Sequence, residues 1–149
     1  MRVVIQRCDE ASVLIDSKET RSIKKGLVVF LGMTNDDTTE DIEYIIKKTK
    51  NLRIFEDDNN KMNYSIQDIN KEVMIISQFT LYANTKDGNR PSFEKCMKFD
   101  KAKELYDTFI NMFKNENIKF VTGEFGADMK VSLINDGPVT IIIDSKENL

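Results

Sequence analysis

The chain has 149 residues, 40% of them hydrophobic and 32% charged, which is the composition expected of one soluble globular domain spanning residues 1–149. The net charge of −3 argues against a protein that binds nucleic acid over its whole surface. Any RNA contact should therefore be small, salt-sensitive and confined to one basic side. The chain contains no histidine, and this excludes Ser-His and Cys-His nucleophile pairs and histidine metal sites.

The cysteines and the lack of long apolar runs indicate the cellular compartment of the protein. Cys8 and Cys96 do not have the spacing of a metal site, and we expect them to be free thiols in a reducing compartment. The sequence has no positively charged apolar leader and no apolar run approaching about 18 residues, so neither export nor a membrane span is expected. We therefore predict a cytoplasmic protein without membrane contact, bound metal or cofactor.

Four segments near the N-terminus have the patterns of β-strands. Residues 2–8 alternate between two faces, and shorter strand-like segments follow at residues 11–15 and 20–23. Gly26 then precedes a continuous apolar run at residues 27–31, which is typical of a central strand covered on both faces.

Thr38-Thr39-Glu40-Asp41 is typical of a helix start, with a hydroxyl cap and acidic residues in the first turn. Ile42 and Ile45 lie on an apolar stripe at helical spacing, which is most simply explained by core packing. The chain leaves the helix within residues 51–55. Residues 56–61 form an acidic, asparagine-rich loop that is too short and irregular for a calcium-binding hand.

Residues 73–82 begin as an apolar run and end with hydroxyl and amide groups, and we predict that they form one buried strand. Because successive side chains of a strand face opposite ways, Ser77 and Phe79 would share one face, and Gln78 and Thr80 the other. Gln78 and Thr80 would then lie together among hydrophobic neighbours, where an amide or hydroxyl costs free energy unless it is hydrogen-bonded. The segment alone fits either a strand end whose polar groups bond nearby backbone or a functional site.

A polar loop and a second helix come next. Lys86 and Arg90 lie in the loop of residues 83–93, directly after the candidate site, and are well placed to touch a phosphate backbone; an ordinary surface loop is the alternative. Asp100 can cap the second helix. The apolar stripe of that helix consists of Ala102, Leu105, Tyr106, Phe109, Met112 and Phe113.

Three strands are predicted near the C-terminus, at residues 118–122, 129–135 and 139–144. Gly137 and Pro138 interrupt the last two. Glycine allows backbone conformations closed to other residues, proline removes an N–H donor, and an X-Pro bond is the only realistic place for a cis peptide. On its own this interruption is most simply a turn or bulge between strands.

Two short motifs together resemble the D-aminoacyl-tRNA deacylase family. The motifs of that family read Ser-Gln-x-Thr and Asn-x-Gly-Pro-x-Thr, and here they stand as Ser77-Gln78-Phe79-Thr80 and Asn135-Asp136-Gly137-Pro138-Val139-Thr140. The likeness continues through Met1-Arg2, Gln6-Arg7, Asn51-Leu52-Arg53-Ile54-Phe55, Gly88-Asn89-Arg90-Pro91-Ser92-Phe93 and Gly126-Ala127-Asp128-Met129. Either motif alone would be weak evidence, but both in this order and with these flanks are specific.

The many strands and two helices predict a mixed α/β fold: two largely antiparallel sheets forming a barrel-like core, with both helices packed outside in β/β/α layers. The resemblance implies the same fold and adds a homodimer. In the family the Gly-Pro turn of one subunit, with its peptide bond cis, enters the active site of the other. A rigid turn with bare carbonyl groups would then line the pocket.

The resemblance also implies an activity, the hydrolysis of the ester bond in D-aminoacyl-tRNA at the acceptor end. Such a carboxylic ester hydrolase proofreads chirality in translation. The enzyme would reject the L form with a wall of main chain where an L side chain projects, which is specificity by steric exclusion. Glycine esters, including glycyl-tRNA mischarged on a non-cognate tRNA, would be accepted because glycine has no side chain to reject.

Two mechanisms are open for the catalytic motif. Thr80 is one candidate nucleophile, but no histidine is present to activate it. In the alternative, which the family resemblance favours, the 2′-hydroxyl of the terminal adenosine helps to activate the attacking water. The hydroxyl of Thr80 or Ser77 would bind the ester oxygen or the water, Gln78 would position it, and backbone N–H groups near Phe79 and Thr80 would form an oxyanion hole.

Further residues are implied for binding and chiral selection. They are Gly137, Pro138, Asn135, Thr140, Arg7 and Met129. Arg7 would orient the Gly-Pro turn, and the alternative for Arg7 is a surface charge on a sheet edge. Two other functions also fit the residues: a binding module that holds an RNA end without cutting it, and a structural dimer whose polar strand end is a satisfied core.

Overall fold

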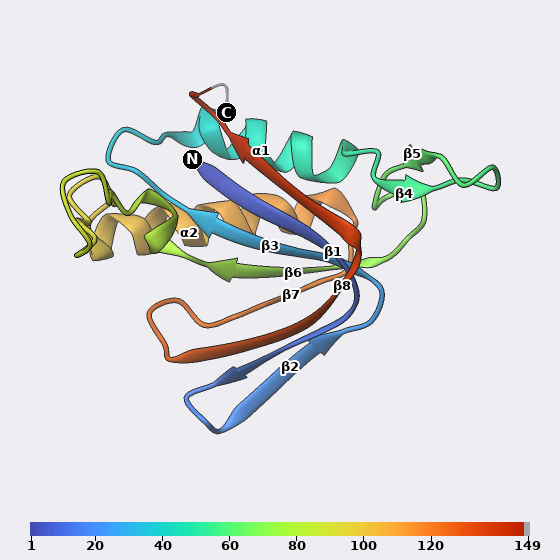
Figure 1. Cartoon of the computed structure of the whole chain (residues 1–149), viewed down its shortest axis with the longest axis horizontal. Helices are drawn as coiled ribbons and strands as arrows, with labels where there is room; N and C mark the ends of the chain where they lie inside the picture. The colour runs from blue at the N-terminus through green and yellow to red at the C-terminus, as the bar shows by residue number, and fades with distance from the viewer. Residues whose placement is uncertain (148–149) are drawn as a thin grey trace.

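One strongly bent, six-stranded sheet frames the structure, a computed structural model that describes residues 1–147 (Figure 1). The last two residues of the predicted domain 1–149 lie outside this description. β8 runs along one edge of β1, whereas β3 and β2 share the other edge, each pairing with one half of β1. The sheet strands are β1 (Arg2–Ile15), β2 (Glu19–Ile23), β3 (Gly26–Gly32), β6 (Glu72–Ser77), β7 (Phe120–Thr122) and β8 (Met129–Asp144).

The two ends of the strand order β2-β1-β3-β6-β7 approach each other, so the sheet is nearly a closed barrel. Arg21 of β2 joins them, because its Nη1 donates to the Thr122 carbonyl oxygen at 2.9 Å and to that of Gly123 at 3.2 Å. Apolar side chains fill the barrel, including Val13, Met74 and others of a buried cluster.

Two helices cover the outer face of the sheet (Figure 1). α1 spans Thr39–Asn51 with Thr38 as its N-cap, within the segment predicted to start the helix, and α2 spans Phe99–Phe113. The N-cap of α2 is Lys98, so the prediction that Asp100 caps this helix is wrong; Asp100 lies in its first turn. Within the described part of the chain, neither these nor the shorter helical turns have the length and apolarity that a membrane crossing requires.

The apolar runs of β3 and β6 are explained by cores on both faces. Leu27 and Val29 face the larger core beneath the helices, whereas Val28 faces the barrel interior. In the same way Ile75 faces the helices and Met74 the interior. A strand that is covered on both sides has no polar face, so its sequence is continuously hydrophobic.

The predicted mixed fold with a barrel-like core and two outer helices is confirmed, but the strands are joined differently from the prediction. Instead of two sheets, one sheet wraps around, because β1 and β8 are long strands that bend at irregularities in their pairing near Cys8. The only other pairing among strands of residues 1–147 is a small hairpin of β4 (Phe55–Glu56) and β5 (Met62–Tyr64). β6 is parallel to both its neighbours because a helix crosses over on each side of it.

Gly26 permits the close approach of β3 to β6, and we predict that Gly26→Ala destabilises the protein by at least about 2 kcal/mol. A Cβ atom at this position would lie 1.9 Å from the Glu72 carbonyl oxygen, which is backbone and cannot turn aside. Urea denaturation of both proteins measures the change in the free energy of unfolding. Lys24→Ala is the control, because Lys24 is an exposed neighbour; equal midpoints for the two variants would contradict the prediction.

Candidate active site

The polar segment after β6 forms a tight turn rather than a strand. The predicted strand 73–82 ends at Ser77, and Phe79–Tyr82 form the 3-10 helix η1. Alternation of faces therefore stops at Ser77, and Thr80 is exposed instead of lying among hydrophobic neighbours. Gln78 and Thr80 do meet, since Gln78 Nε2 donates to Thr80 Oγ1 at 2.5 Å.

Two tertiary contacts hold η1 in place. At its start the N–H of Gln78 donates to the Leu31 carbonyl at 2.7 Å, and at its end Arg2 Nη1 donates to the Leu81 carbonyl at 3.1 Å. Arg2 is itself fixed by Asp144, whose Oδ2 accepts from Arg2 Nε at 2.9 Å. Burial raises the pKa of the Asp144 carboxyl, but two backbone N–H groups and the Arg2 guanidinium outweigh burial and hold that pKa below its usual value. Asp144 therefore stays ionised at neutral pH and keeps Arg2 in position.

A pocket of about 650 Å³ opens beside the end of β6, and we call it the β6 pocket. Its walls come from β6 and η1, from the start of α2 with the segment before it, and from the β7–β8 connection with the start of β8. The volume is within the range of small-molecule sites. The lining residues are Ile76, Ser77, Gln78, Phe79, Phe93, Cys96, Met97, Lys98, Phe99, Ala102, Phe125, Gly126, Ala127, Met129 and Val131.

The predicted catalytic residues and Met129 thus meet at one place. Ser77, Gln78 and Phe79 line the β6 pocket together with Met129, and Thr80 is joined to it through Gln78. Phe93, Phe99 and Phe125 were not predicted as site residues. Phe93 belongs to one of the segments that carry the family resemblance, but no local pattern groups the three rings, because they come from separate segments that only the fold brings together.

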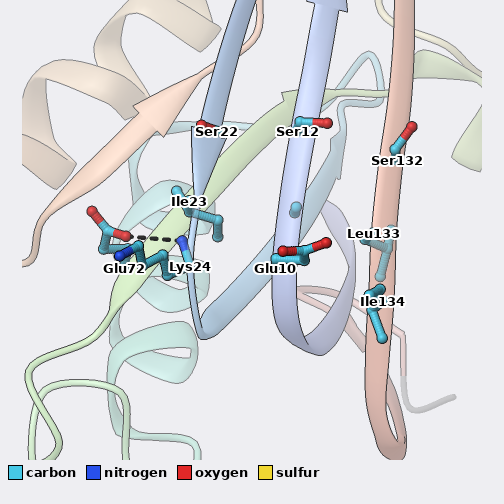
Figure 2. Close-up of a pocket in the computed structure, with 10 residues that line it drawn as sticks. Glu10, Ser12, Ser22, Ile23, Lys24, Glu72, Ser132, Leu133 and Ile134 are labelled. Atoms are coloured by element: carbon cyan, nitrogen blue, oxygen red, sulfur yellow. Dashed lines mark hydrogen bonds between the residues drawn. The ribbon is translucent and has the colours of Figure 1, made fainter.

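A second hollow, of about 670 Å³, lies on the outside of β1, β2 and β8 (Figure 2). Serines from these three adjacent strands, Ser12, Ser22 and Ser132, stand in register across it. The Glu72 carboxylate at its edge accepts a hydrogen bond from the Lys24 backbone N–H at 3.1 Å. None of the residues predicted for catalysis or binding lines this hollow.

The Gly-Pro turn, residues 136–138, is a bulge within β8 and not a break between two strands. The Gly137-Pro138 peptide bond is cis, and both residues are exposed. Asn135 spans the bulge, because its Nδ2 donates to the carbonyl oxygens of Arg7 at 2.9 Å and Val139 at 3.0 Å.

Arg7 is buried beneath this turn, so the alternative of a surface charge on a sheet edge is wrong. Its Nε donates to the Asp136 carbonyl oxygen and lies near the Asp136 carboxylate, each at 3.1 Å, and its Nη1 donates to the Ile54 carbonyl at 2.6 Å. Thr140 on the far side of the turn accepts from Gln6 Nε2 at 3.0 Å. Arg7 therefore ties the turn to the hairpin that follows α1.

Within one protomer, the Gly-Pro turn and the β6 pocket lie far apart. Asn135 pairs with Cys8, and Cys8 pairs with Gly26. Gly26 pairs with Glu72, so the turn is level with the start of β6. The pocket lies beyond Ser77 at the other end of this strand, about 16 Å away at about 3.3 Å per residue. Figure 1 shows the C-terminal end of β6 on the opposite side of the molecule from the bend in β8.

Lys86 and Arg90, predicted to contact tRNA, do not line the β6 pocket. Asn84 and Ser92 exchange backbone hydrogen bonds of 2.8 and 2.9 Å, which close the loop at its base. Both basic side chains are exposed in the loop between these two residues. They are therefore accessible from solvent, and their contact with tRNA stays a prediction.

The β6 pocket has few groups for proton transfer. Its lining residues, all within the described range, include no carboxylate and no imidazole. Burial raises the pKa of the Cys96 thiol, whose Sγ donates to the Phe79 carbonyl at 3.2 Å, so this thiol stays protonated and is a poor nucleophile. In residues 1–147 no three potential metal-ligating side chains of His, Cys, Asp or Glu gather at one point. The arrangement can position and polarise a ligand through hydroxyl, amide and backbone groups.

Two solved structures share this architecture. A protein described as c-Myc DNA Unwinding Element Binding Protein is 37% identical, with a TM-score of 0.90 over 99% of this chain and 100% of that one. A probable eukaryotic D-amino acid tRNA deacylase has a TM-score of 0.84 at 17% identity, over 95% of this chain and 97% of that one. Fold and pocket together define a small α/β protein with a nearly closed barrel, two outer helices and a pocket at the end of β6.

Comparison with known sequences is more specific. A family model described as D-Tyr-tRNA(Tyr) deacylase matches residues 4–144. A D-aminoacyl-tRNA deacylase of Finegoldia magna is 56% identical over 98% of this chain and 99% of its own length, and one of Thermosipho africanus is 53% identical over 99% of both. The chain belongs to the D-Tyr-tRNA(Tyr) deacylase family, so the resemblance predicted from the two motifs is confirmed.

Proposed function

We propose that this protein hydrolyses the ester bond of D-aminoacyl-tRNA, releases the free D-amino acid and the tRNA, and leaves L-aminoacyl-tRNA intact. The observation that carries the proposal is the match, over nearly the whole chain, to relatives named D-aminoacyl-tRNA deacylase. Residues 1–149 act as a single domain in this proposal. The activity removes D-amino acids from tRNA before translation uses them, which places the protein in the cytoplasm.

The β6 pocket is the proposed site of the reaction. Water attacks the carbonyl carbon, the bond from that carbon to the 3′ oxygen breaks, and the proton lost by water ends on the departing oxygen. The N–H groups of Phe79 and Thr80 open η1 and have no partner within it, as at the start of any helix. They are suited to bind the developing oxyanion, with Ser77 and Gln78 holding the ester or the water.

The Gly-Pro turn reaches this site from the partner subunit of a homodimer. Support comes from the separation of about 16 Å between turn and pocket within one chain and from the exposure of Gly137 and Pro138. Arg7 and Asn135 hold the turn rigid from behind through their hydrogen bonds. A fixed main-chain wall excludes an L side chain, and it gives glycyl esters no side chain to exclude.

Incubation with D-tyrosyl-tRNA and L-tyrosyl-tRNA tests the activity. Selective release of D-tyrosine is expected. Protection of the ester without release would instead identify an RNA-end binding module, and no effect on either substrate would identify a structural dimer.

Mixed dimers test the crossing of the turn. One chain carries Gln78→Trp, which fills the rim of its pocket, and the other carries Gly137→Val, which destroys its turn; different affinity tags isolate dimers with one chain of each. Each homodimer should be inactive, whereas the mixed dimer has one intact composite site and should show about half of wild-type activity. An inactive mixed dimer would place turn and pocket of each site in the same chain.

A further inference from the structure

Among the large apolar side chains of residues 1–147, that of Phe99 is the most exposed, at 62%. It is the first residue of α2, and it stands at the rim of the β6 pocket. One edge of its ring rests on Gly126, where an added Cβ would come within 2.9 Å of Phe99 Cε2 and Cζ. The ring centroid is 5.3 Å from that of Phe125 inside the pocket. Phe99 is therefore seated firmly against the pocket wall although much of its surface is open to solvent.

Three exposed lysines are close to Phe99 in sequence. Lys98 precedes it and lines the pocket, Lys101 is in the same helical turn, and Lys95 is in the segment before α2; all three are exposed. Among the ion pairs formed within residues 1–147, none includes these lysines. Asp100 is the one carboxylate between them in sequence. Exposed aromatic rings beside cations with no fixed partner are the usual means of holding single-stranded nucleic acid.

We propose that Phe99 and Lys98 form a subsite for the second nucleotide from the 3′ end of the RNA, outside the site for the terminal aminoacyl-adenosine. This inference rests on the proposed function, which places the terminal nucleoside in the β6 pocket. The next base stacks on the exposed part of the Phe99 ring, and the phosphate that links the two nucleotides meets the Lys98 ammonium. The subsite accepts any base, because every base has a π face, and this suits the single-stranded end that all tRNAs share.

Substrates of two lengths separate this subsite from the reaction site. The short one is adenosine with D-tyrosine on its 3′ oxygen, and the long one is the trinucleotide CCA with D-tyrosine at the same position. Wild-type protein should show a lower KM for the trinucleotide. Phe99→Leu should raise the KM for the trinucleotide on the order of 10-fold, should leave its kcat unchanged, and should leave kcat/KM for the adenosine ester within about twofold.

Rescue and matched controls identify stacking as the cause. Phe99→Trp should restore the low KM, since it restores a stacking surface, whereas Tyr44→Leu removes an exposed aromatic ring from α1 and should change nothing. Lys98→Gln should weaken the dependence of the trinucleotide KM on salt concentration, and Lys47→Gln on α1 should not.

Other outcomes overturn the inference in distinct ways. Equal losses on both substrates would make Phe99 part of the adenosine site, and unchanged kinetics on both would leave it without a ligand. If wild-type protein hydrolyses both esters with the same KM, the subsite fails while the proposed function stands. If it hydrolyses neither these esters nor D-tyrosyl-tRNA, the proposed function fails as well.

Discussion

Replacing Gly137 by alanine should lower kcat/KM for D-tyrosyl-tRNA about 100-fold and should reduce the preference for the D form over the L form. Gly137 has φ +149°, a backbone conformation that residues with a side chain rarely adopt. An added Cβ would lie 2.5 Å from the Val139 nitrogen and 2.7 Å from Val139 Cγ2. The turn must therefore shift, and a chiral barrier made of main chain loses its shape when the main chain moves. Single-turnover deacylation of D- and L-tyrosyl-tRNA measures both effects.

Gly88→Ala is a matched control for this substitution. Gly88 has φ +150°, nearly the value of Gly137, but an added Cβ would meet no atom within 4 Å. The control therefore imposes similar local backbone strain without moving the Gly-Pro turn, and its preference for the D form should equal that of the wild type. Since Gly137 is exposed, its alanine variant should also keep a cooperative urea transition. A folded Gly137→Ala protein with normal discrimination would remove the turn from chiral selection.

The regular elements were predictable where local pattern and burial agree. The apolar stripe with Ile42 and Ile45 gave the first helix, and the continuous run at residues 27–31 gave a central strand because both its faces are covered. The joining of residues 2–8 and 11–15 into β1 was not predictable, since a bulge does not appear in an alternating pattern until the partner strand is known.

The geometry of the site depended on contacts that no local pattern records. Residues 79–82 leave the predicted strand because the carbonyl of Leu31 and the guanidinium of Arg2 hold them in a turn, and both come from distant parts of the chain. The two sequence motifs identified the family, but they did not give the spatial separation between the two motifs in the fold. Only the register of β1, β3 and β6 shows that the Gly-Pro turn and the β6 pocket lie near opposite ends of β6 within one protomer.

Removing the 2′-hydroxyl of the terminal adenosine should slow hydrolysis 100-fold or more, at the scale of lost general acid–base catalysis, which is on the order of 10² to 10⁴. The residues that line the β6 pocket carry no carboxylate and no imidazole, and the Cys96 thiol is held protonated by burial. The 2′-hydroxyl is adjacent to the ester, so it can accept the proton of the attacking water and pass it to the 3′ oxygen. The substrate for this test is tRNA that ends in 2′-deoxyadenosine with D-tyrosine on its 3′ oxygen. Its binding should change little, so the loss should appear in kcat.

Thr80→Ala is the counterpart of this experiment on the protein side. If Thr80 only positions the ester or the water, its loss should leave appreciable activity, because Ser77, Gln78 and the backbone N–H groups remain. A nucleophilic Thr80 predicts the reverse pattern: complete loss in Thr80→Ala with an intact fold, and near-normal turnover of the deoxy substrate by the wild type. The substrate-assisted mechanism therefore predicts the larger loss for the deoxy substrate, whereas a nucleophilic Thr80 predicts the larger loss for Thr80→Ala. Measuring both variations in one assay decides whether Thr80 attacks the ester or the 2′-hydroxyl activates the attacking water.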